Sequence, residues 1–404
     1  MSQHKPVRPP HSAWFVLVWA AVIAAVVSTI TWWVLKPQAS ADPKPPTPTA
    51  TSSTAPAPTP EPVVLTRQHS LLIQVRNPDQ LAVDNAIAVV GGDVQATVIT
   101  TLPGLMVNIP GDKTATLAEA GKVDDTLASV HSMTDLLGAQ IDGGLTLDPL
   151  ALAGLVDSVG GIVVDVQEPL LATQGDNKIV DIIPAGWQVM RGPRAMEYAL
   201  TLGPSEGDRR ARFSAVLNEI VLRLPDSPER TRQLITSLGS LARSTVPTDD
   251  LVDVLTALHE QAVLGEQLDA VLPVTDVNSE NLVELNRPKA DRLLRATMPE
   301  LLLAAGEAPR IRVEVQNGTG KVELGGSAAQ TLIKDGFAVI DATVTTPQAQ
   351  SKVEVPNSSQ IALDRGKQVA QALGLEPSAV VVTPQMPERV DAIAVLGKEE
   401  LATD

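Results

Sequence analysis

The pattern of apolar and polar positions divides the chain into three parts. Residues 13–35, AWFVLVWAAVIAAVVSTITWWVL, form an uncharged apolar run. Residues 37–62, PQASADPKPPTPTATSSTAPAPTPEP, are rich in Pro, Thr and Ala and show no apolar periodicity. From residue 64 onward, short apolar runs alternate with amphipathic stretches, which predicts folded domains.

In the first folded part, strands alternate with helices. The pattern predicts strands in 70–75, 85–92 and 162–170, a strand and a turn in 95–111, and helices in 126–138, 148–161 and 191–200. The helix in 126–138 is expected to bury Leu127, Val130, Met133 (or Thr134) and Leu137, and the helix in 148–161 is expected to stop at Gly160 and Gly161. A helical stretch with an irregular middle is expected in 228–305. The alternation predicts a layered α/β (α+β) domain over 64–305.

A second compositional break falls at LAAGEAPR, residues 303–310. Beyond it, IRVEVQNGTG, AVIDATVTT, AVVVTPQ and DAIAVLG predict strands, and GGSAAQTLIKDGF and IALDRGKQVAQALG predict helices. We therefore expect a smaller α/β domain over 308–398.

The apolar run at 13–35 predicts one transmembrane helix, because 23 residues at about 1.5 Å each span a bilayer. Trp14, Trp32 and Trp33 lie at its ends, where interfacial aromatic residues belong. A cleaved signal peptide is the competing interpretation, but its apolar region is shorter and ends at small residues. This run ends in TWWVLKPQ.

The basic residues before the run favour a cytoplasmic N-terminus. Residues 1–12 are then a cytoplasmic tail, residues 36–63 a disordered Pro-, Thr- and Ala-rich spacer, and the bulk of the chain is extracytoplasmic at the cell membrane.

Composition excludes several classes of function. A net charge of -16 argues against a nucleic-acid partner, and 2% aromatic residues argue against a sugar-binding surface built on stacked rings. The chain has no cysteine, and its five histidines show no metal-ligand spacing. The abundance of Ala, Val and Asp is typical of a high-GC Gram-positive, actinobacterial source.

One basic cluster stands out in this acidic chain. SEGDRRARFSAVLNEIVLRL, residues 205–224, places Arg209, Arg210 and Arg212 at the start of a predicted helix, where an anion is favoured. Arg209 and Arg212 share a helix face, and Arg210, turned about 100° away, is expected to be solvated. Two interpretations stay open for the pair: anion binding, or structural ion pairs with Glu206, Asp208 or Glu219.

Two stretches resemble known families. LTLDPLALAGLVDSVGGIVVDVQEPL (145–170), PAGWQVMRGPRAMEYA (184–199) and LLIQVRNPDQLAVDNAIAVV (71–90) resemble the LytR-CpsA-Psr (LCP) family of cell-envelope glycopolymer transferases. VEVQNGTG and AAQTLIKDGFAV, within 310–397, resemble the LytR C-terminal domain. The resemblance implies transfer of a glycopolymer from polyprenyl pyrophosphate to a peptidoglycan hydroxyl. In that family arginines clamp the pyrophosphate and aspartates bind a divalent cation.

The sequence departs from the family pattern where the arginines are expected. Gly104 stands in place of the Arg of a Pro-Arg-Asp turn, and Leu200 and Leu202 replace both arginines of a Tyr-x-Arg-x-Arg segment that keeps its Tyr198. Losing three guanidiniums removes about three charge-assisted hydrogen bonds of roughly 1.5–3 kcal/mol each.

What matches the family are Arg209 and Arg212, as an anion-binding or pyrophosphate-binding remnant, and Asp84, as a metal-binding position. For Asp84 we favour a turn or strand-edge carboxylate, because a lone carboxylate binds metal weakly. We favour a core role for Tyr198 and a tight turn for Asn317, Gly318 and Gly320.

The leading hypothesis is a non-catalytic pseudoenzyme that acts by binding in cell-wall assembly, with no cofactor. Its expected partners are the cytoplasmic membrane, a wall glycopolymer, peptidoglycan or polyprenyl lipid, and other envelope proteins. The first alternative is an active phosphotransferase, with Mg²⁺ and with clamp arginines such as Arg76, Arg191 or Arg194. The second is a polyprenyl-lipid-binding protein with a large apolar tunnel under its sheet.

The membrane topology is directly testable. A Ser53→Cys variant should react with a membrane-impermeant thiol reagent in intact cells, because the spacer is expected outside the membrane. Labelling only after permeabilisation would contradict the predicted orientation.

Overall fold

The computed structural model describes residues 65–122, 125–174, 178–277, 281–387 and 389–398. The tail, membrane span and spacer predicted for residues 1–63 lie outside these residues. Within the described ranges, no helix is both long and apolar enough to cross a bilayer.

A six-stranded mixed sheet organises the first folded part. Its strand order is β11-β6-β1-β2-β3-β12. The central strands β1 and β2 are antiparallel, as are β2 and β3, whereas β6 runs parallel to β1 and β12 runs parallel to β3. The strands are β1 (His69–Arg76), β2 (Ala82–Val90), β3 (Thr97–Thr101), β6 (Gly143–Leu147), β11 (Ala242–Ser244) and β12 (Leu268–Val271).

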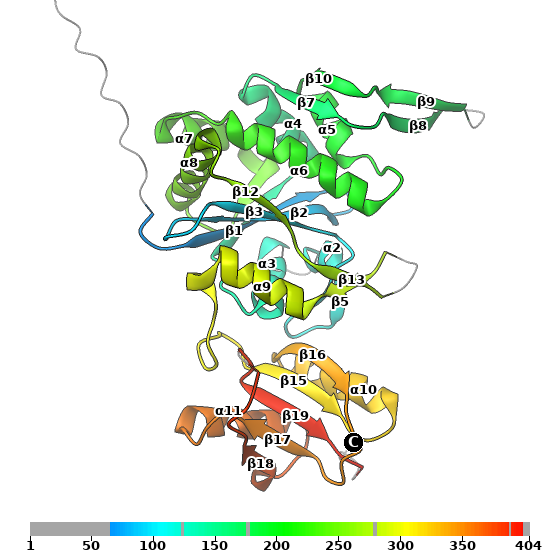
Figure 1. The fold of residues 1–404 in the computed structure, drawn as a ribbon, viewed down its shortest axis with the longest axis vertical. Coiled ribbons are helices and arrows are strands. Elements are labelled where there is room, and N and C mark those ends of the chain that lie inside the picture. The colour runs from blue at the N-terminus through cyan, green and yellow to red at the C-terminus, as the bar shows by residue number, and fades with distance from the viewer. Residues whose placement is uncertain (1–64, 123–124, 175–177, 278–280, 388, 399–404) are drawn as a thin grey trace, which may run out of the picture. The chain divides into compact units, whose positions relative to one another are not determined.

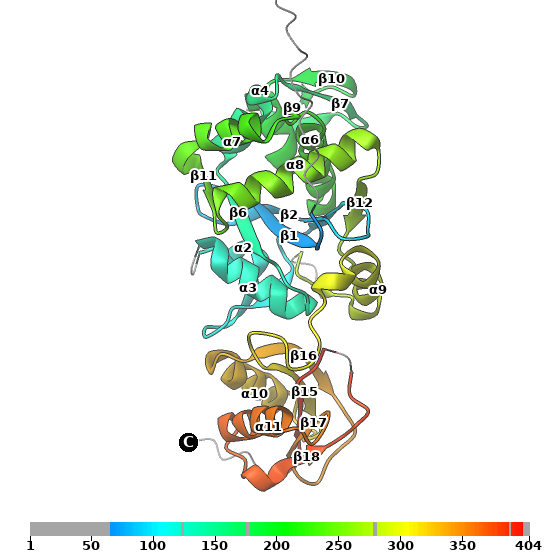
Figure 2. The same ribbon diagram turned by 90° about the vertical axis from the view of Figure 1, so that its left-hand side faces the viewer.

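Helices cover both faces of this sheet (Figures 1 and 2). Along β1, alternate side chains enter different cores: Leu71 and Ile73 pack into one and Leu72 into the other. One face carries α4 (Pro149–Ser158), α5 (Gly192–Leu200), α6 (Glu206–Leu222), α7 (Pro228–Ser237) and α8 (Thr248–Leu264). The other carries α2 (Leu117–Ala120), α3 (Asp125–Leu137) and α9 (Arg287–Thr297). The predicted layered α/β fold is confirmed for the described residues.

The helix starts and stops follow local chemistry. Asp148 caps α4 through a hydrogen bond from the Leu150 amide to its carboxylate, at 2.9 Å, and α4 ends before Gly160 and Gly161, both at positive φ. In α3, Val130, Met133 and Leu137 are buried as predicted, but Leu127 is 42% exposed, so the apolar face is narrower than its spacing indicates.

The stretch predicted as helical over 228–305 contains strands that were missed. β11 and β12 lie at the two edges of the main sheet, and β13 pairs with β14. These strands have three or four residues each, too few for an alternating pattern to appear in the sequence.

Four shorter strand pairings and 3-10 turns complete this part. Strand β7 pairs with β10, and β8 with β9, forming an antiparallel ribbon. The strands are β4 (Met106–Asn108), β5 (Thr114–Thr116), β7 (Ile162–Val166), β8 (Leu170–Gln174), β9 (Lys178–Ile183), β10 (Gly186–Met190), β13 (Val274–Asp276) and β14 (Val283–Leu285). The 3-10 turns are η1 (Gly239–Leu241) and η2 (Pro299–Leu301).

The C-terminal residues form a five-stranded sheet with the order β16-β15-β19-β17-β18. Its elements are β15 (Arg312–Asn317), α10 (Val322–Lys334), β16 (Ala338–Val344), β17 (Lys352–Val355), α11 (Gln360–Ala372), η3 (Pro377–Ala379), β18 (Val380–Val382) and β19 (Ala392–Leu396). The sequence did not predict β17, although Val353 and Val355 are fully buried.

The C-terminal sheet has its own hydrophobic core, made only of residues between Ile311 and Leu396. A fragment from Ala308 to Asp404 should therefore fold alone and unfold cooperatively on heating. Circular dichroism provides the measurement, and a random-coil spectrum would show that this core is insufficient by itself.

Candidate functional site

The start of α6 lies over the face of the sheet that carries Asp84. Ser205 caps the helix: its Oγ accepts a hydrogen bond from the Asp208 amide at 3.1 Å and donates one to the Asp208 carboxylate at 2.7 Å. Glu206 and Asp208 both belong to the first turn. The positive end of the helix dipole therefore already faces two carboxylates of its own helix.

Arg209 is buried and makes its contacts inside the protein. Its Nε lies 3.5 Å from Asp84 Oδ1, and its Nη2 lies 2.5 Å from Glu206 Oε2 and donates to the Val83 carbonyl at 2.5 Å. The ion pair with Glu206 is one of the structural pairs that the sequence left open. The guanidinium joins α6 to β2 and reaches little solvent.

Asp84 is not at a turn or a strand edge, so that expectation was wrong. It lies within β2, opposite Val75 in the register with β1, and is 1% exposed. The burial of Asp84 could not be read from the sequence, because a carboxylate between Val83 and Asn85 carries no signal of burial. The pKa of Asp84 is raised from 3.8 to about 7, because the effect of burial, together with the smaller effect of the Glu206 carboxylate, outweighs the lowering by the Arg209 and Arg212 guanidiniums.

Arg212 hydrogen-bonds to backbone carbonyls at the C-terminal end of α5. Its Nε donates to the Tyr198 carbonyl at 2.8 Å, its Nη2 donates to the Thr201 carbonyl, and its guanidinium carbon lies 5.9 Å from the centre of the Tyr198 ring. A cation that satisfies the last carbonyls of a helix stabilises it. Burial raises the pKa of the Tyr198 hydroxyl, and Asp165 contributes a smaller rise.

Arg210 is only partly solvated, which corrects the expectation from the sequence that it lies in solvent. It is half-buried and its Nη1 donates to Thr100 Oγ1, on β3, at 2.9 Å. Burial lowers its pKa, and Asp84 opposes that shift. The helical spacing turns Arg210 away from Arg209, but both side chains reach the sheet, Arg209 at β2 and Arg210 at β3.

The three positions without the expected arginines have different surroundings. A Cβ on Gly104 would lie 2.0 Å from the backbone oxygen of Asn281, and Gly104 accepts a hydrogen bond from the Val283 amide at 3.0 Å. Leu200 is half-buried against the core, whereas Leu202 is 60% exposed. An arginine side chain has room at Leu202, but at Gly104 the backbone of another segment blocks it.

Two family models match the chain. The LytR_cpsA_psr family model matches residues 91–292, half of the chain. The chain belongs to the LytR-CpsA-Psr family. The model described as LytR cell envelope-related transcriptional attenuator matches residues 310–398. No curated protein matches the chain.

Several solved structures resemble this LytR-CpsA-Psr protein. TagV of B. subtilis is 13% identical, with 59% of this chain and 98% of that chain covered and a TM-score of 0.49. A LytR-Csp2A-Psr enzyme from Actinomyces oris is 20% identical, with 59% and 96% covered and a TM-score of 0.46. A structure titled "TagT bound to LIIa-WTA" is 16% identical, with 58% and 91% covered and a TM-score of 0.45.

The arginines considered as substitutes in this LytR-CpsA-Psr protein do not converge on Asp84. Arg76 is buried and donates to the Gly121 carbonyl at 3.2 Å and to Gln74 Oε1 at 3.1 Å, so it lies toward α2, whereas Asp84 faces α6. Arg191 precedes α5, and Arg194 is exposed, 3.9 Å from Glu197.

The divalent cation that the LytR-CpsA-Psr family implies does not fit these residues. A hard cation of this kind takes several oxygen ligands. Asp84 faces Arg209 instead, and the part of the chain that the structure describes holds no group of three or more His, Cys, Asp or Glu side chains arranged for a metal. We therefore derive no catalytic step through a metal at this site.

An apolar cavity of about 40 Å³ lies between the sheet and the helices that cover the α6 face. It is lined entirely by aliphatic side chains, including Ile73, Leu145, Leu217 and Leu255. An apolar cavity that admits benzene measures about 150 Å³, so this cavity is too small for a polyprenyl chain unless the helices move apart.

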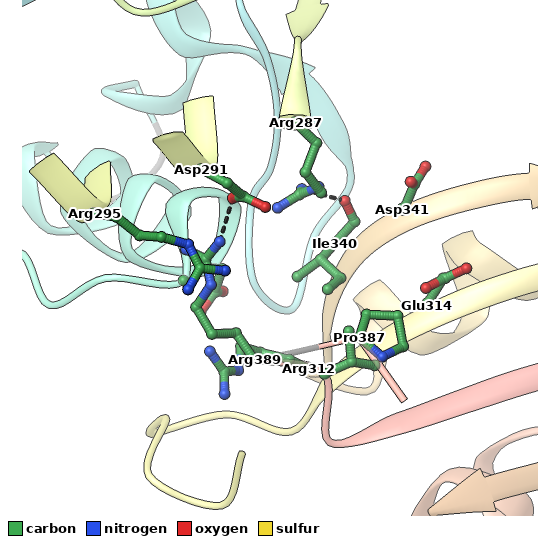
Figure 3. A pocket seen from close by; sticks show the side chains of 12 residues that line it. Arg287, Asp291, Arg295, Arg312, Glu314, Ile340, Asp341, Pro387 and Arg389 are labelled. Carbon is green, nitrogen blue, oxygen red and sulfur yellow. Dashed lines mark hydrogen bonds and ion pairs between the residues drawn. The ribbon is translucent and has the colours of Figure 1, made fainter. Parts of the chain in front are cut away.

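A second cavity, of about 150 Å³, is lined by four arginines and four carboxylates (Figure 3). Arg389 donates to the Leu137 carbonyl at 2.8 Å and pairs with Asp291, and Arg287 donates to the Ile340 carbonyl at 2.7 Å. The four arginines are balanced by the four carboxylates, and the contacts named here are all made within the protein. The sequence missed this cluster, since its members are separated by up to about 250 positions.

The Asn317 turn needs no ligand to explain it. Asn317 Nδ2 donates to the Lys321 carbonyl at 2.8 Å, its Oδ1 accepts from the Thr319 amide at 3.1 Å, and Gly320 has φ of 79°. The side chain and the positive φ together form a tight turn before α10, as expected from the sequence.

The buried carboxyl of Asp84 predicts a specific pH dependence. A folded-state pKa of about 7 against 3.8 unfolded means that the folded state holds the proton more tightly. The stabilisation is complete below pH 3.8 and is lost as pH rises toward and past 7. Relative to Asp84→Asn, the wild type should lose about 4 kcal/mol of unfolding free energy between pH 4 and pH 8. Urea unfolding at a series of pH values measures the difference, and parallel pH profiles of the two proteins would contradict it.

Proposed function

We propose that this LytR-CpsA-Psr protein is a membrane-anchored, extracytoplasmic protein that binds wall components during cell-envelope assembly and does not transfer glycopolymer. The observation that carries the proposal is the environment of Gly104. The Asn281 carbonyl occupies the volume that a side chain at position 104 would need. A guanidinium cannot enter there without moving that backbone.

The remaining arginines of α6 support a structural role. Arg209 contacts Asp84 and Glu206, and Arg212 contacts the carbonyls that end α5. A pyrophosphate would have to displace these partners, leaving buried carboxylates without their ion pairs and carbonyls without hydrogen bonds. Each such unpaired group costs about 1–3 kcal/mol, or more when it is charged. Tight pyrophosphate binding at this site is therefore unfavourable.

Catalysis of phosphoryl transfer depends on donors placed around the developing charge. Removing one well-placed donor lowers a rate by roughly 100-fold to 1000-fold. This chain has no guanidinium at Gly104, Leu200 or Leu202. Asp84, the carboxylate that matches the family's metal-binding position, is paired with Arg209. We propose that the fold keeps a binding role in the wall after the transfer chemistry is lost.

The anchor is part of the proposal. The uncharged run at 13–35 supports a single span with a cytoplasmic N-terminus, and the Pro-rich spacer would then hold the folded residues away from the outer face of the cell membrane. Wall glycopolymer, peptidoglycan and other envelope proteins are the partners that such a location makes available.

Polyprenyl-lipid binding remains a second candidate, because the cavity beside α6 is wholly apolar. Its volume requires the covering helices to separate before a chain enters. Mass spectrometry of the purified protein would detect retained polyprenyl phosphate, and its presence would favour this candidate.

A complementation experiment tests the absence of transfer. The chain would be produced in a host that lacks its own LytR-CpsA-Psr transferases, and wall-linked polymer would be quantified. We expect background levels, at least about 1000-fold below an active transferase, because the pyrophosphate donors are missing. An active family member serves as the positive control.

Restored polymer that disappears in an Arg209→Ala variant would overturn the proposal in favour of an active phosphotransferase. A double variant, Leu200→Arg with Leu202→Arg, provides a matched comparison, with a second double variant at exposed positions, Leu222→Arg with Leu264→Arg, as the control for two added charges. The double variant should bind pyrophosphate more tightly than the control while still failing to restore polymer.

A further inference from the structure

The cavity shown in Figure 3 is lined by residues of α3, α9, β15 and β16 and of the segment before β19. Its volume is about 150 Å³. Two of its lining side chains, Asp135 and Arg312, are buried, whereas Arg295 and Asp341 are exposed, so solvent reaches the cavity. Ligand sites often lie where two folded parts of a chain meet. The cavity therefore combines buried charged groups with access for a small molecule.

Three charged groups that line this cavity form no direct ion pair with any residue that the structure describes: Arg287, Glu314 and Asp341. The Arg287 guanidinium donates to two backbone carbonyls, at 3.2 and 2.7 Å. Glu314 accepts from an amide side chain and Asp341 from a backbone amide, each at 2.8 Å. Internal salt bridges therefore do not account for these three charges.

A fourth charged group, Asp135, leaves one oxygen unsatisfied. Its Oδ2 accepts from Arg310 Nε at 2.8 Å, but its buried Oδ1 has no hydrogen-bond partner in the described part of the chain. Burial raises the pKa of Asp135, and the hydrogen bond from Arg310 opposes that rise. Buried polar atoms are almost always paired, so this oxygen indicates a donor that the chain itself does not supply.

The charges around the cavity are balanced in number but separated in space. Figure 3 shows the Glu314 and Asp341 carboxylates projecting from β15 and β16, with the Arg295 and Arg389 guanidiniums on the opposite side of the view. Arg287 is the first residue of α9, where the helix dipole is positive. A simple anion in this cavity is repelled by the carboxylates, and a simple cation by the guanidiniums. A molecule with one charge of each sign, on different atoms, avoids both repulsions.

We propose that this cavity binds a small α-amino acid in its zwitterionic form. The ligand's carboxylate accepts from the Arg287 guanidinium, in the geometry that makes Arg–carboxylate pairs strong. Its ammonium group has three N–H donors, which match three acceptors: Glu314, Asp341 and Asp135 Oδ1. This site is separate from Asp84 and the start of α6, and the inference does not depend on the proposed function.

The size of the cavity limits the ligand. An apolar cavity of about 150 Å³ admits benzene, and alanine has as many non-hydrogen atoms as benzene. A neighbouring cavity of about 230 Å³ shares Arg287, Ile340 and Asp341 and is also lined by Met106 and Leu136. The side chain of a larger amino acid would have to extend into that second cavity. We therefore expect glycine and alanine to fit best.

The test is isothermal titration calorimetry of the purified full chain with alanine, acetate and methylamine. Acetate carries only the negative group of the amino acid, and methylamine carries only the positive group. Alanine should bind with a Kd on the order of 1 mM. Acetate and methylamine should each bind at least about tenfold more weakly, because either one leaves part of the charged lining unpaired.

Substitutions at the cavity should weaken the binding of alanine. Asp341→Asn and Glu314→Gln each remove a charge that faces the ammonium group, and Arg287→Gln removes the partner of the carboxylate, so each should raise the Kd at least about tenfold. Glu323→Gln, at an exposed position of α10, is the matched control and should bind like the wild type. Circular dichroism checks that each variant is folded. If Arg287→Gln does not fold, the exposed Asp341→Asn variant decides.

No binding of alanine by the wild type would overturn the proposal, and so would equal binding by Asp341→Asn and Glu323→Gln. Acetate that binds as tightly as alanine would identify an anion site, and methylamine that does so a cation site. Either result would also overturn the zwitterion. None of these outcomes changes the wall-linked polymer measured by complementation, so this inference and the proposed function can fail separately.

Discussion

The central strand pair β1–β2 is buried on both faces, and this constraint governs the chemistry of the fold. Any polar side chain on these strands must find its partner inside the protein, because water is excluded on either side. Asp84 meets Arg209 from α6 on one face, and Gln74 meets Asn85 at 2.7 Å on the other. Asp84 and Arg209 are therefore engaged in holding the layers of this fold together.

This constraint explains why an acidic chain gathers arginines at the start of α6. Each of the three guanidiniums connects that helix to a different neighbour: Arg209 to β2, Arg210 to β3 and Arg212 to the end of α5. Hydrogen bonds from a charged donor to a carbonyl or hydroxyl are worth more than neutral ones, and three of them fix the helix in place. The three arginines therefore fix the position of α6 against β2, β3 and the end of α5.

The sequence predicted the elements whose signals are local. The helix from Pro149, with its Asp148 cap and its two glycines, shows a strong periodicity and clear boundaries. The short edge strands β11 and β12 were missed because they depend on a neighbouring strand and carry no pattern of their own. The sequence also did not reveal that Asp84 is buried and Arg210 half-buried, because the layer of the fold that covers each side chain decides its exposure. Spacing along one helix identified the arginines, but only tertiary packing identified their partners.

The close approach of Asn281 to Gly104 limits which residues position 104 can carry. Asn281 has φ of 60°, a conformation that Asn tolerates better than most residues, and its carbonyl occupies the volume next to Gly104. Any residue with a Cβ at position 104 would meet that carbonyl at 2.0 Å and would lose stability unless the backbone at Asn281 moved. The choice of residue at position 104 is therefore coupled to the position of a backbone segment almost 180 residues further along the chain.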